Sequence, residues 1–452
     1  LTCVIESRLG LTVIGWYWIA TTLKALKCVR IMIEGLGLRY ALVAHHFWDR
    51  PGGSQLLSAA SALGLEASGY APVLVSVFSS DPSKYVDWFG IDLSKYPIYS
   101  LFGFKLRAFG LYSRLINWAA IEKALERYGA ELVFTDSCFY GRIEKKLVKK
   151  RVKLLEYVHY PIELELRQEL KRASLHYAED PYFMERYGRF PLNIYWRLFV
   201  SLAPRFIREN PFSIASAVLT NSKWTAELVE KLYGEKPQVL NPPIAPNVEI
   251  IEEPRDFVAR ENSIVMIGRF SEEKRYHWVV EKLVPKLAKE VGGLKLYIFG
   301  DTGTKTSMSY LSRVESLAVK AGLRVSRSLE AVADVYLIAD APRKTINEVA
   351  DSSKVFLHAT VNEHWGIAVA EAMARGLPVV VHKSGGAWSD LVSMGAFGFG
   401  YDDEVEAVES IARLMTDENQ WRNYSRRSIK RAKEFTLEKF VEKFTAVLRK
   451  IA

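Results

Sequence analysis

Cysteine is scarce in this chain, and its scarcity excludes several classes of protein. Three cysteines occur among the 452 residues, Cys3, Cys28 and Cys138, and their scattered spacing fits neither a disulfide framework nor a structural zinc site. A reducing compartment is therefore expected. Internal repeats and low-complexity tracts are also missing from the sequence, which argues against solenoid and linker-like proteins.

Long hydrophobic runs are missing as well. The best candidate, residues 9–23, is shorter than the roughly 20 residues that a helix needs to cross a bilayer. Lys24, Lys27 and Arg30 follow it. A short anchor, an interfacial helix, a signal-like segment and an upstream extension from a misassigned start are all open interpretations. We favour an anchor-like or interfacial role for the apolar segment 1–38.

Charge of neither sign dominates. The 61 Lys and Arg residues against 52 Asp and Glu residues give a net charge of +9. This mild excess favours anionic partners, either nucleotide diphosphates or acidic lipid head groups. No zinc spacing, basic-helix motif or aromatic-basic RNA motif accompanies it, so nucleic acid is not expected as a partner.

The order of predicted elements indicates an α/β protein with two domains. The hydrophobic content of 49% and charged content of 25% are typical of a globular protein. Strands alternate with helices in two blocks, which predicts parallel sheets. We place the domains at 39–214 and 215–425, with helical spacing continuing through 426–452. Residues 162–212 are expected to form an extended helical insertion in the first domain.

The most informative stretch is VFLHATVNEHWGIAVAEAMARGLPVVVHKSGGAWSD, residues 355–390. It predicts a buried strand, a loop with Glu363, a helix that opens at Gly366-Ile367 and carries Glu371, and a second buried strand. Ligands of open parallel sheets lie beyond the carboxyl ends of the strands. Backbone N–H groups at the start of the helix attract an anion. A phosphate on those amides, flanked by two carboxylates, suggests a sugar nucleotide.

Three other strand ends carry candidate residues. Gly52-Gly53 follows the first strand and lets backbone approach a ligand closely at a helix N-terminus. His159 ends the strand that begins at Lys153. Gly268-Arg269 and Lys274 follow the strand 263–267, and two cations at this spacing can clamp a diphosphate and neutralise charge as it leaves the sugar.

These motifs together resemble the retaining GT-B glycosyltransferases of family four. The match rests on E-x7-E (Glu363 and Glu371), on the loops 362–367 and 382–386, and on the strand end 157–161. It is greatest for the eukaryotic dolichol-pathway α-1,2-mannosyltransferases. The resemblance implies two facing Rossmann-like domains and a C-terminal helix, 426–452, that crosses back to the first domain.

The resemblance also implies roles for these residues. Glu371 would hold the ribose, Glu363 with the amides of Gly366 and Ile367 would hold the sugar, and Arg269 and Lys274 would take the diphosphate. The Gly52-Gly53 pair would lie against that diphosphate from the opposite domain, and His159 would contact the donor sugar near the reacting centre.

By the same resemblance the donor is GDP-mannose and the acceptor is a polyprenyl-linked oligosaccharide. The enzyme would need no metal or other cofactor, and would act in the cytoplasm at the cytosolic face of a membrane. No short motif separates guanine from uracil or mannose from glucose. Two alternatives stay open: a sugar-nucleotide epimerase or soluble sugar-phosphate glycosyltransferase of the same fold, and a non-enzymatic basic protein that binds membranes or nucleic acid.

Overall fold

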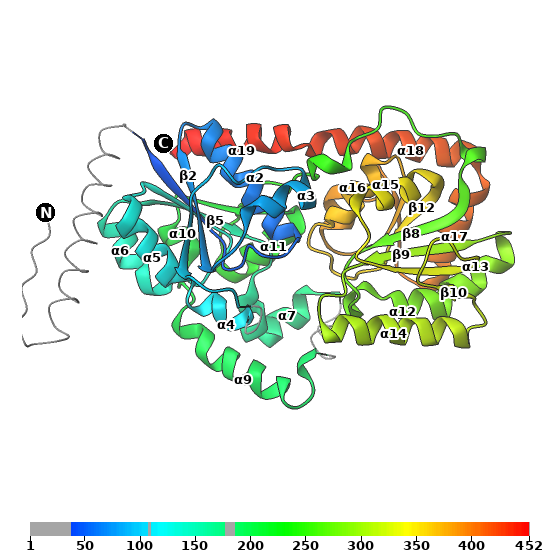
Figure 1. The fold of residues 1–452 in the computed structure, drawn as a ribbon, viewed down its shortest axis with the longest axis horizontal. Helices are drawn as coiled ribbons and strands as arrows, with labels where there is room; N and C mark the ends of the chain where they lie inside the picture. Colours follow the sequence, from blue (N-terminus) through cyan, green and yellow to red (C-terminus); the bar gives the residue numbers. More distant parts are fainter. Residues whose placement is uncertain (1–37, 107–109, 177–185, 452) are drawn as a thin grey trace, which may run out of the picture.

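The computed structural model describes residues 38–106, 110–176 and 186–451, which form two α/β domains lying side by side (Figure 1). Each domain is built on a seven-stranded sheet in which neighbouring strands are parallel. Strands covered by helices on both faces read as nearly continuous apolar runs, as in the buried Ala41–Ala44 segment. The predicted fold class is confirmed. The expected apolar segment 1–38 falls almost wholly outside the described residues.

The first sheet has the strand order β3-β2-β1-β4-β5-β6-β7. Its strands are β1 (Tyr40–Ala44), β2 (Ala71–Phe78), β3 (Ile98–Phe102), β4 (Leu132–Thr135), β5 (Lys153–Val158), β6 (Ala217–Thr220) and β7 (Gln238–Val239). Its helices are α2 (Gly53–Ala67), α3 (Tyr85–Phe89), α4 (Gly110–Leu115), α5 (Asn117–Tyr128), α6 (Glu144–Lys149), α7 (Gln168–Ser174), α9 (Leu192–Leu202), α10 (Pro211–Ile214) and α11 (Lys223–Tyr233). The helical character expected for 162–212 is confirmed where the structure describes it.

The domain boundary expected at 214/215 is wrong. β6 and β7 pair with β5 in the first sheet, and α11 between them belongs to the same domain. The second domain therefore begins after Asn241-Pro242-Pro243. The sequence shows a new strand and helix after residue 215, but not which sheet they join.

The second sheet has the order β10-β11-β9-β8-β12-β13-β14. Its strands are β8 (Glu261–Ile267), β9 (Lys295–Gly300), β10 (Val325–Ser326), β11 (Val335–Ala339), β12 (Ser353–His358), β13 (Val379–His382) and β14 (Phe399–Tyr401). Its helices are α12 (Tyr276–Trp278), α13 (Val284–Glu290), α14 (Lys305–Lys320), α15 (Arg343–Ser352), α16 (Ile367–Ala374) and α17 (Glu404–Thr416).

Two final helices run along both domains (Figure 1). α18 (Glu418–Ala432) packs on α16 of the second domain, and α19 (Leu437–Ile451) packs on α2 of the first. The fully buried Phe444 meets the ring of Phe134 edge-on, with centroids 5.8 Å apart. The expected crossing is confirmed, although the chain passes between the domains after α18 rather than at residue 426.

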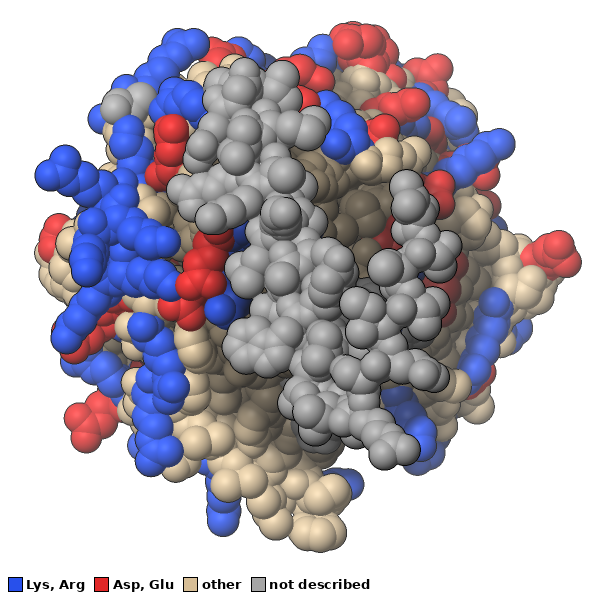
Figure 2. Space-filling view, turned by 60° about the vertical axis from the view of Figure 1, so that its left-hand side comes forward, with Lys and Arg blue, Asp and Glu red and all other residues tan. Residues whose placement is uncertain are grey.

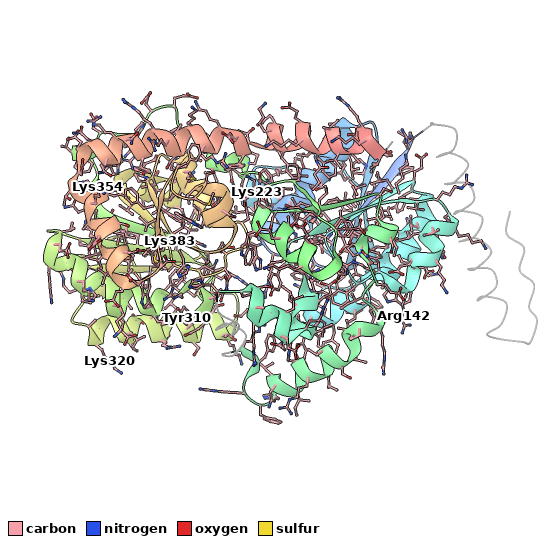
Figure 3. All side chains as sticks on the ribbon, turned by 180° about the vertical axis from the view of Figure 1, so that it is seen from behind. Arg142, Lys223, Tyr310, Lys320, Lys354 and Lys383 are labelled. Atoms are coloured by element: carbon pink, nitrogen blue, oxygen red, sulfur yellow. The ribbon has the colours of Figure 1, made fainter. Side chains whose placement is uncertain are left out.

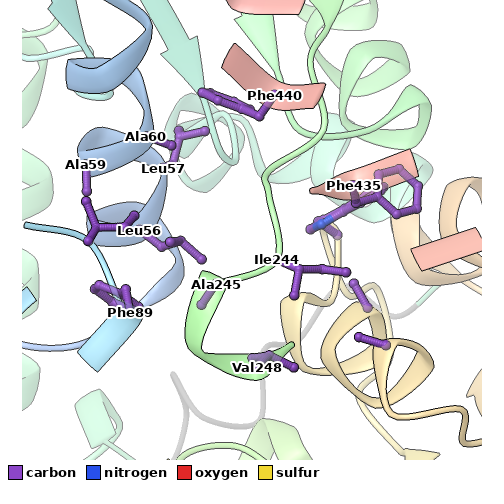
Figure 4. Packing of buried hydrophobic residues seen from close by; sticks show 14 of the residues in the cluster. Leu56, Leu57, Ala59, Ala60, Phe89, Ile244, Ala245, Val248, Phe435 and Phe440 are labelled. Atoms are coloured by element: carbon purple, nitrogen blue, oxygen red, sulfur yellow. The ribbon is translucent and has the colours of Figure 1, made fainter. Parts of the chain in front are cut away.

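Two chain segments thus join the domains, and they touch each other. The backbone N–H of Ile244, just after the Pro-Pro exit from the first domain, donates to the carbonyl of Phe435, which precedes α19 (2.7 Å). Apolar side chains from α2 and from both segments pack around this junction (Figure 4). Their continuous core fixes how the two sheets lie across from each other.

Candidate active site

Glu363 and Lys274 meet at the carboxyl edge of the second sheet. Glu363 lies in the loop after β12, and Lys274 ends a 3₁₀ turn that follows β8. Lys274 Nζ lies 3.0 Å from Glu363 Oε2, and His358 Nε2 lies 2.8 Å from the same oxygen. Two predicted site residues that are distant in sequence therefore form one ion pair, which a buried histidine completes.

The Glu363 carboxylate is held in its charged form. Burial raises the pKa of a carboxyl group, but Lys274 and His358 outweigh burial here and hold the pKa of Glu363 well below its usual range. Burial lowers the pKa of His358. Since an ionised carboxylate only accepts, the hydrogen between these groups belongs to His358 Nε2. Glu363 is thus a rigid acceptor, suited to the hydroxyls of a sugar.

Glu371 has a partner that the sequence did not reveal. It lies on α16, 6% exposed, with Oε2 2.9 Å from Nη1 of Arg343. Arg343 opens α15, so the pair joins the start of α15 to the second turn of α16. The arginine fixes the rotamer of the carboxylate, which would otherwise be a buried charge without a partner.

Arg269 and Lys274 engage different carboxylates. The guanidinium of Arg269 is 59% exposed and lies 3.1 Å from Glu273 Oε1, an oxygen that also accepts from Ser271. Lys274 instead reaches Glu363. A clamp made of both cations, as the sequence suggests, would require at least one of them to change partner.

The glycines mark places where backbone and side chains crowd. A Cβ on Gly268 would lie 3.2 Å from Cε of Lys274, so this glycine leaves room for the lysine stem. A Cβ on Gly53 would lie 2.8 Å from Cδ1 of Ile367. The N-termini of α2 and α16 therefore face each other across the two domains. Gly52 and Gly366 stand at their N-cap positions, and no side chain caps either helix.

Two histidines flank a buried aspartate at the edge of the first sheet. His45 Nδ1 lies 2.8 Å from Asp136 Oδ2, and His159 Nε2 lies 3.2 Å from the same oxygen. These residues follow β1, β4 and β5, which are neighbours in the sheet. Burial opposes ionisation, yet the two histidines outweigh it and lower the pKa of Asp136. The amide of Gln55 contacts His45 Nε2 at 3.0 Å and donates to the carbonyl of Phe47, so the hydrogen between His45 and Asp136 lies on Nδ1.

Rings from both domains stack at the cleft. His364, next to Glu363, lies parallel to Tyr160 with centroids 4.7 Å apart and to Trp224 with centroids 5.9 Å apart. Burial lowers the pKa of His364 to about 4, so the ring is neutral near pH 7. The stack connects the loop that carries Glu363 to the strand end that carries His159.

Polar contacts cross the same junction. Asp390 of the second domain accepts from the backbone N–H of Lys223, the first residue of α11 (3.0 Å), where Figure 3 shows Lys223 between the domains. The N–H of His176, from the helical insertion, donates to Asn362 Oδ1 (3.1 Å). Carboxylates at helix N-termini are stabilised by the helix dipole. Because both hydrogen bonds join the two domains, the cleft between the domains is closed at these points.

Close backbone crossings hold the Glu363 loop in place. A Cβ on Gly385 would lie 2.2 Å from the Glu363 carbonyl oxygen, and Gly385 has a φ of +72°. The N–H of Gly386 donates to that carbonyl (2.7 Å). Only glycine fits both the positive φ of residue 385 and the close approach of the Glu363 backbone. This explains the Gly-Gly pair after β13.

Within the described ranges, no group of three or more His, Cys, Asp or Glu side chains has the geometry of a metal site. None of the described helices is long and apolar enough to span a membrane.

Comparisons with known proteins agree with this architecture. Residues 247–435 match the family described as Glycosyl transferases group 1. The matched residues cover the second domain and α18. The structure of sucrose-phosphate synthase from Thermosynechococcus elongatus superposes with a TM-score of 0.64 at 15% identity, covering 92% of this chain and 99% of that one. The likeness establishes the two-domain GT-B fold.

Several curated relatives share one name, GDP-Man:Man(3)GlcNAc(2)-PP-Dol alpha-1,2-mannosyltransferase. The protein of Mus musculus is 26% identical over 381 residues, which are 80% of this chain and 72% of that protein. The protein of Eremothecium gossypii is 25% identical over 248 residues, which are 54% of this chain and 39% of that protein. The chain thus spans well under half the length of this fungal relative. The resemblance to family-four GT-B glycosyltransferases is confirmed.

Sequence reasoning missed four residues that position the predicted ones: His45, Asp136, Arg343 and His358. Three of them stand at or just after the carboxyl end of a predicted or observed strand, which is the signal that would have found them. Arg343 follows a strand, Val335–Ala339, that the sequence analysis did not identify.

Proposed function

We propose that this chain is a retaining glycosyltransferase that moves mannose from GDP-mannose to a polyprenyl-linked oligosaccharide. The observation that carries the proposal is the pair of Glu363 and Lys274 beside the facing N-termini of α2 and α16. A charged acceptor for sugar hydroxyls, a cation and two sets of helix amides converge there. The names of the curated relatives supply the donor and acceptor.

Glu363 would hold hydroxyls of the mannose, and Glu371, fixed by Arg343, would hold the ribose of the nucleotide. Lys274 would move from Glu363 to the diphosphate as negative charge develops on it, with Arg269 joining from the cleft edge. Each such contact contributes about 2–4 kcal/mol of barrier lowering. The amides at the starts of α16 and α2 would add partial positive charge from opposite domains.

In the transfer step, the bond between the anomeric carbon and the phosphate oxygen breaks, and the acceptor oxygen bonds to the anomeric carbon on the same face. The acceptor hydroxyl proton passes to the leaving phosphate. His159, held by Asp136, would contact the sugar from the first domain. In this proposal, Lys274, Arg269 and the helix amides stabilise the diphosphate, so that the step uses no metal. The reaction would take place at the cytosolic face of a membrane.

The test is a transfer assay with GDP-mannose and a synthetic pyrophosphate-linked oligosaccharide in detergent, with EDTA present. We expect a product extended by one α-linked mannose, and no product from Glu363→Gln. UDP-glucose serves as the competing donor and fructose 6-phosphate as a soluble acceptor. Transfer to the soluble acceptor alone, or an epimerised nucleotide sugar without transfer, would replace this proposal with the corresponding alternative.

A further inference from the structure

A second cavity, of about 290 Å³, lies next to the loop that carries Glu363. We call it the histidine pocket. Its wall in the second domain is formed by Glu272, Arg275, His277, Val361, His382 and Asp402. These residues end or follow strands β8, β12, β13 and β14, which are neighbours in the sheet. The pocket therefore stands at the carboxyl edge of the second sheet, where parallel sheets bind ligands. Its size is at the lower end of ligand cavities and suits one small group.

The side chains of Lys274 and Arg275 separate this pocket from the proposed donor site. Lys274 reaches Glu363, whereas the guanidinium of Arg275 lies over the ring of Trp278, 4.3 Å from its centroid. Nη1 of Arg275 also lies 3.4 Å from the carbonyl oxygen of Ala359. With the residues that the structure describes, Arg275 forms no ion pair. Since a guanidinium has five N–H donors, most of its capacity is left for a ligand.

The two carboxylates of the pocket, in contrast, already have cationic partners. Oε2 of Glu272 accepts from Nη1 of Arg313 at 2.7 Å, and Oδ2 of Asp402 lies 3.2 Å from Nζ of Lys383. A carboxylate can accept about four hydrogen bonds. Each of these groups therefore keeps acceptor sites, and the wall offers both donors and acceptors.

Neutral imidazoles complete the wall. Burial lowers the pKa of His277 and of His382 to about 4, so both rings are neutral near pH 7. A neutral imidazole offers one donor and one acceptor. His382 is also tied to the Glu363 loop, because its Nδ1 lies 2.9 Å from Oγ of Ser384, which accepts from the N–H of Asn362 at 2.7 Å.

Two buried hydroxyls stand directly beside the pocket. Thr360 precedes Val361 and Tyr401 precedes Asp402, and neither hydroxyl has a hydrogen-bond partner among the described residues. The Tyr401 ring contacts His382, with centroids 5.4 Å apart. Buried polar groups are nearly always hydrogen-bonded. The region around the pocket therefore has hydrogen-bonding capacity that the fold does not use.

The first domain closes the pocket. His176, just after α7, is part of the wall, and its ring meets His382 edge-on with centroids 4.9 Å apart. Its backbone N–H holds the side chain of Asn362. The pocket is therefore complete only when the two domains meet, and it lies at the cleft into which an acceptor must enter.

We propose that the histidine pocket binds one hexose residue of the acceptor glycan, as a subsite beside the reacting centre. Hexose hydroxyls donate to carboxylates and imidazoles and accept from a guanidinium, so a single ring can use every kind of group in the wall. A phosphate would find Arg275, but it would also face Glu272 and Asp402, which repel an anion. The inference rests on the proposed function for the identity of the acceptor as a glycan.

The test is a ligand-observed NMR titration of the full chain with an α-linked mannotriose, without donor. We expect wild type to bind it, and Arg275→Gln and Asp402→Asn each to raise the dissociation constant about ten- to a hundredfold, as for loss of one hydrogen bond to a charged group. Asp402 is 53% exposed in its side chain, so its replacement spares the core. Affinity for GDP should stay the same in both variants.

Two controls remove a positive charge elsewhere. Arg324→Gln takes an exposed guanidinium from the opposite end of the second sheet, beside β10. Lys and Arg side chains also gather on one side of the first domain (Figure 2), and Lys149→Gln removes an exposed charge from α6 of that domain. Neither control should change binding of the trisaccharide.

Steady-state kinetics with the pyrophosphate-linked acceptor gives a second measurement. A subsite that holds the glycan equally in the ground state and in the transition state changes KM and not kcat. Arg275→Gln and Asp402→Asn should therefore raise KM for the acceptor about tenfold or more and leave KM for GDP-mannose unchanged.

Failure of this inference is distinguishable from failure of the proposed function. Absence of trisaccharide binding to wild type, or binding that neither variant weakens, would overturn the subsite even if transfer occurs. Displacement of the trisaccharide by inorganic phosphate would make the pocket an anion site and would overturn it too. Binding through Arg275 and Asp402 in a chain that transfers no sugar would support the pocket and contradict the proposed function.

Discussion

The imidazole of His364, from the second domain, lies flat on the phenol ring of Tyr160, from the first, with centroids 4.7 Å apart and planes inclined by 10°. The two residues immediately follow Glu363 and His159, respectively. Opening of the cleft would separate these rings, so the stack reports on domain closure at the point where the sugar would lie.

Acid should weaken the folded state through His364. Burial lowers its pKa to about 4, against 6.5 for the unperturbed group, so the unfolded chain takes up the proton first as pH falls. The free energy of unfolding should then decrease between about pH 6.5 and 4, by up to about 1.4 kcal/mol per pH unit for this one group. Unfolding of wild type and His364→Phe at pH 7 and 4.5 measures it. An identical pH dependence in the variant would contradict the prediction.

Removing the Glu371 carboxylate should weaken nucleotide binding. In the proposed complex, Glu371→Ala would take a charged acceptor from the ribose. Loss of such a hydrogen bond costs about 1.5–3 kcal/mol, or a rise in the dissociation constant of about ten- to a hundredfold. Calorimetry with GDP measures it. Glu348→Ala on the exposed face of α15 is the control. Arg343→Ala should weaken binding as well. The double variant should lose less affinity than the sum of the two single losses, because Arg343 holds the Glu371 carboxylate in place. Unchanged affinity in Glu371→Ala would show that the pair is only structural.

Lys274→Ala should lower turnover more than it weakens binding of substrate. In the proposed reaction, negative charge on the departing diphosphate grows in the transition state. Removing the lysine should therefore raise the activation free energy by about 2–4 kcal/mol, which lowers kcat and changes KM little. Steady-state kinetics separates the two effects. Lys282→Ala, from the π-helical turn after α12, controls for the loss of one charge. A variant with altered KM and normal kcat would make Lys274 a binding contact alone.

Asp136→Asn should reduce transfer by acting through His159. The variant replaces a charged hydrogen-bond acceptor, worth about 1.5–3 kcal/mol, by a neutral amide. We expect a loss of activity of about ten- to a hundredfold, a changed pH profile, and little further loss when His159→Ala is added. Full additivity of the two substitutions would show that the aspartate supports the fold and not the histidine.

The C-terminal helix should stabilise the first domain. Phe444→Ala removes a fully buried ring that packs on Phe134, and substitutions of this kind cost about 3–5 kcal/mol. Chemical unfolding followed by tryptophan fluorescence measures the change. Glu442→Ala, on the exposed side of the same helix, should have almost no effect. Equal stability of both variants would mean that α19 is not part of the core.

The sequence predicts most of the fold because its signals are local. The limits of β2, β6 and α11 come from apolar runs and from caps such as Ser222, whose hydroxyl accepts from the N–H of Thr225. Motif order also places Glu363 and Lys274 on one sheet edge. Their direct ion pair, the partner Arg343 and the sheet to which β6 belongs depend on contacts between distant segments, which no local pattern contains.

The return of α19 to the first domain bears on how the chain is made. Phe444 completes a core whose other members, such as Phe134, Leu57 and Gly64, are synthesised some 300 or more residues earlier. The first domain therefore cannot reach its full stability when its own strands have left the ribosome. Part of α2 stays uncovered until the whole second domain and α19 have been translated. Folding in order from the N-terminus, the usual route for domains arranged in series, is unavailable to this topology, and its nascent form has a long-lived apolar surface for chaperones to bind.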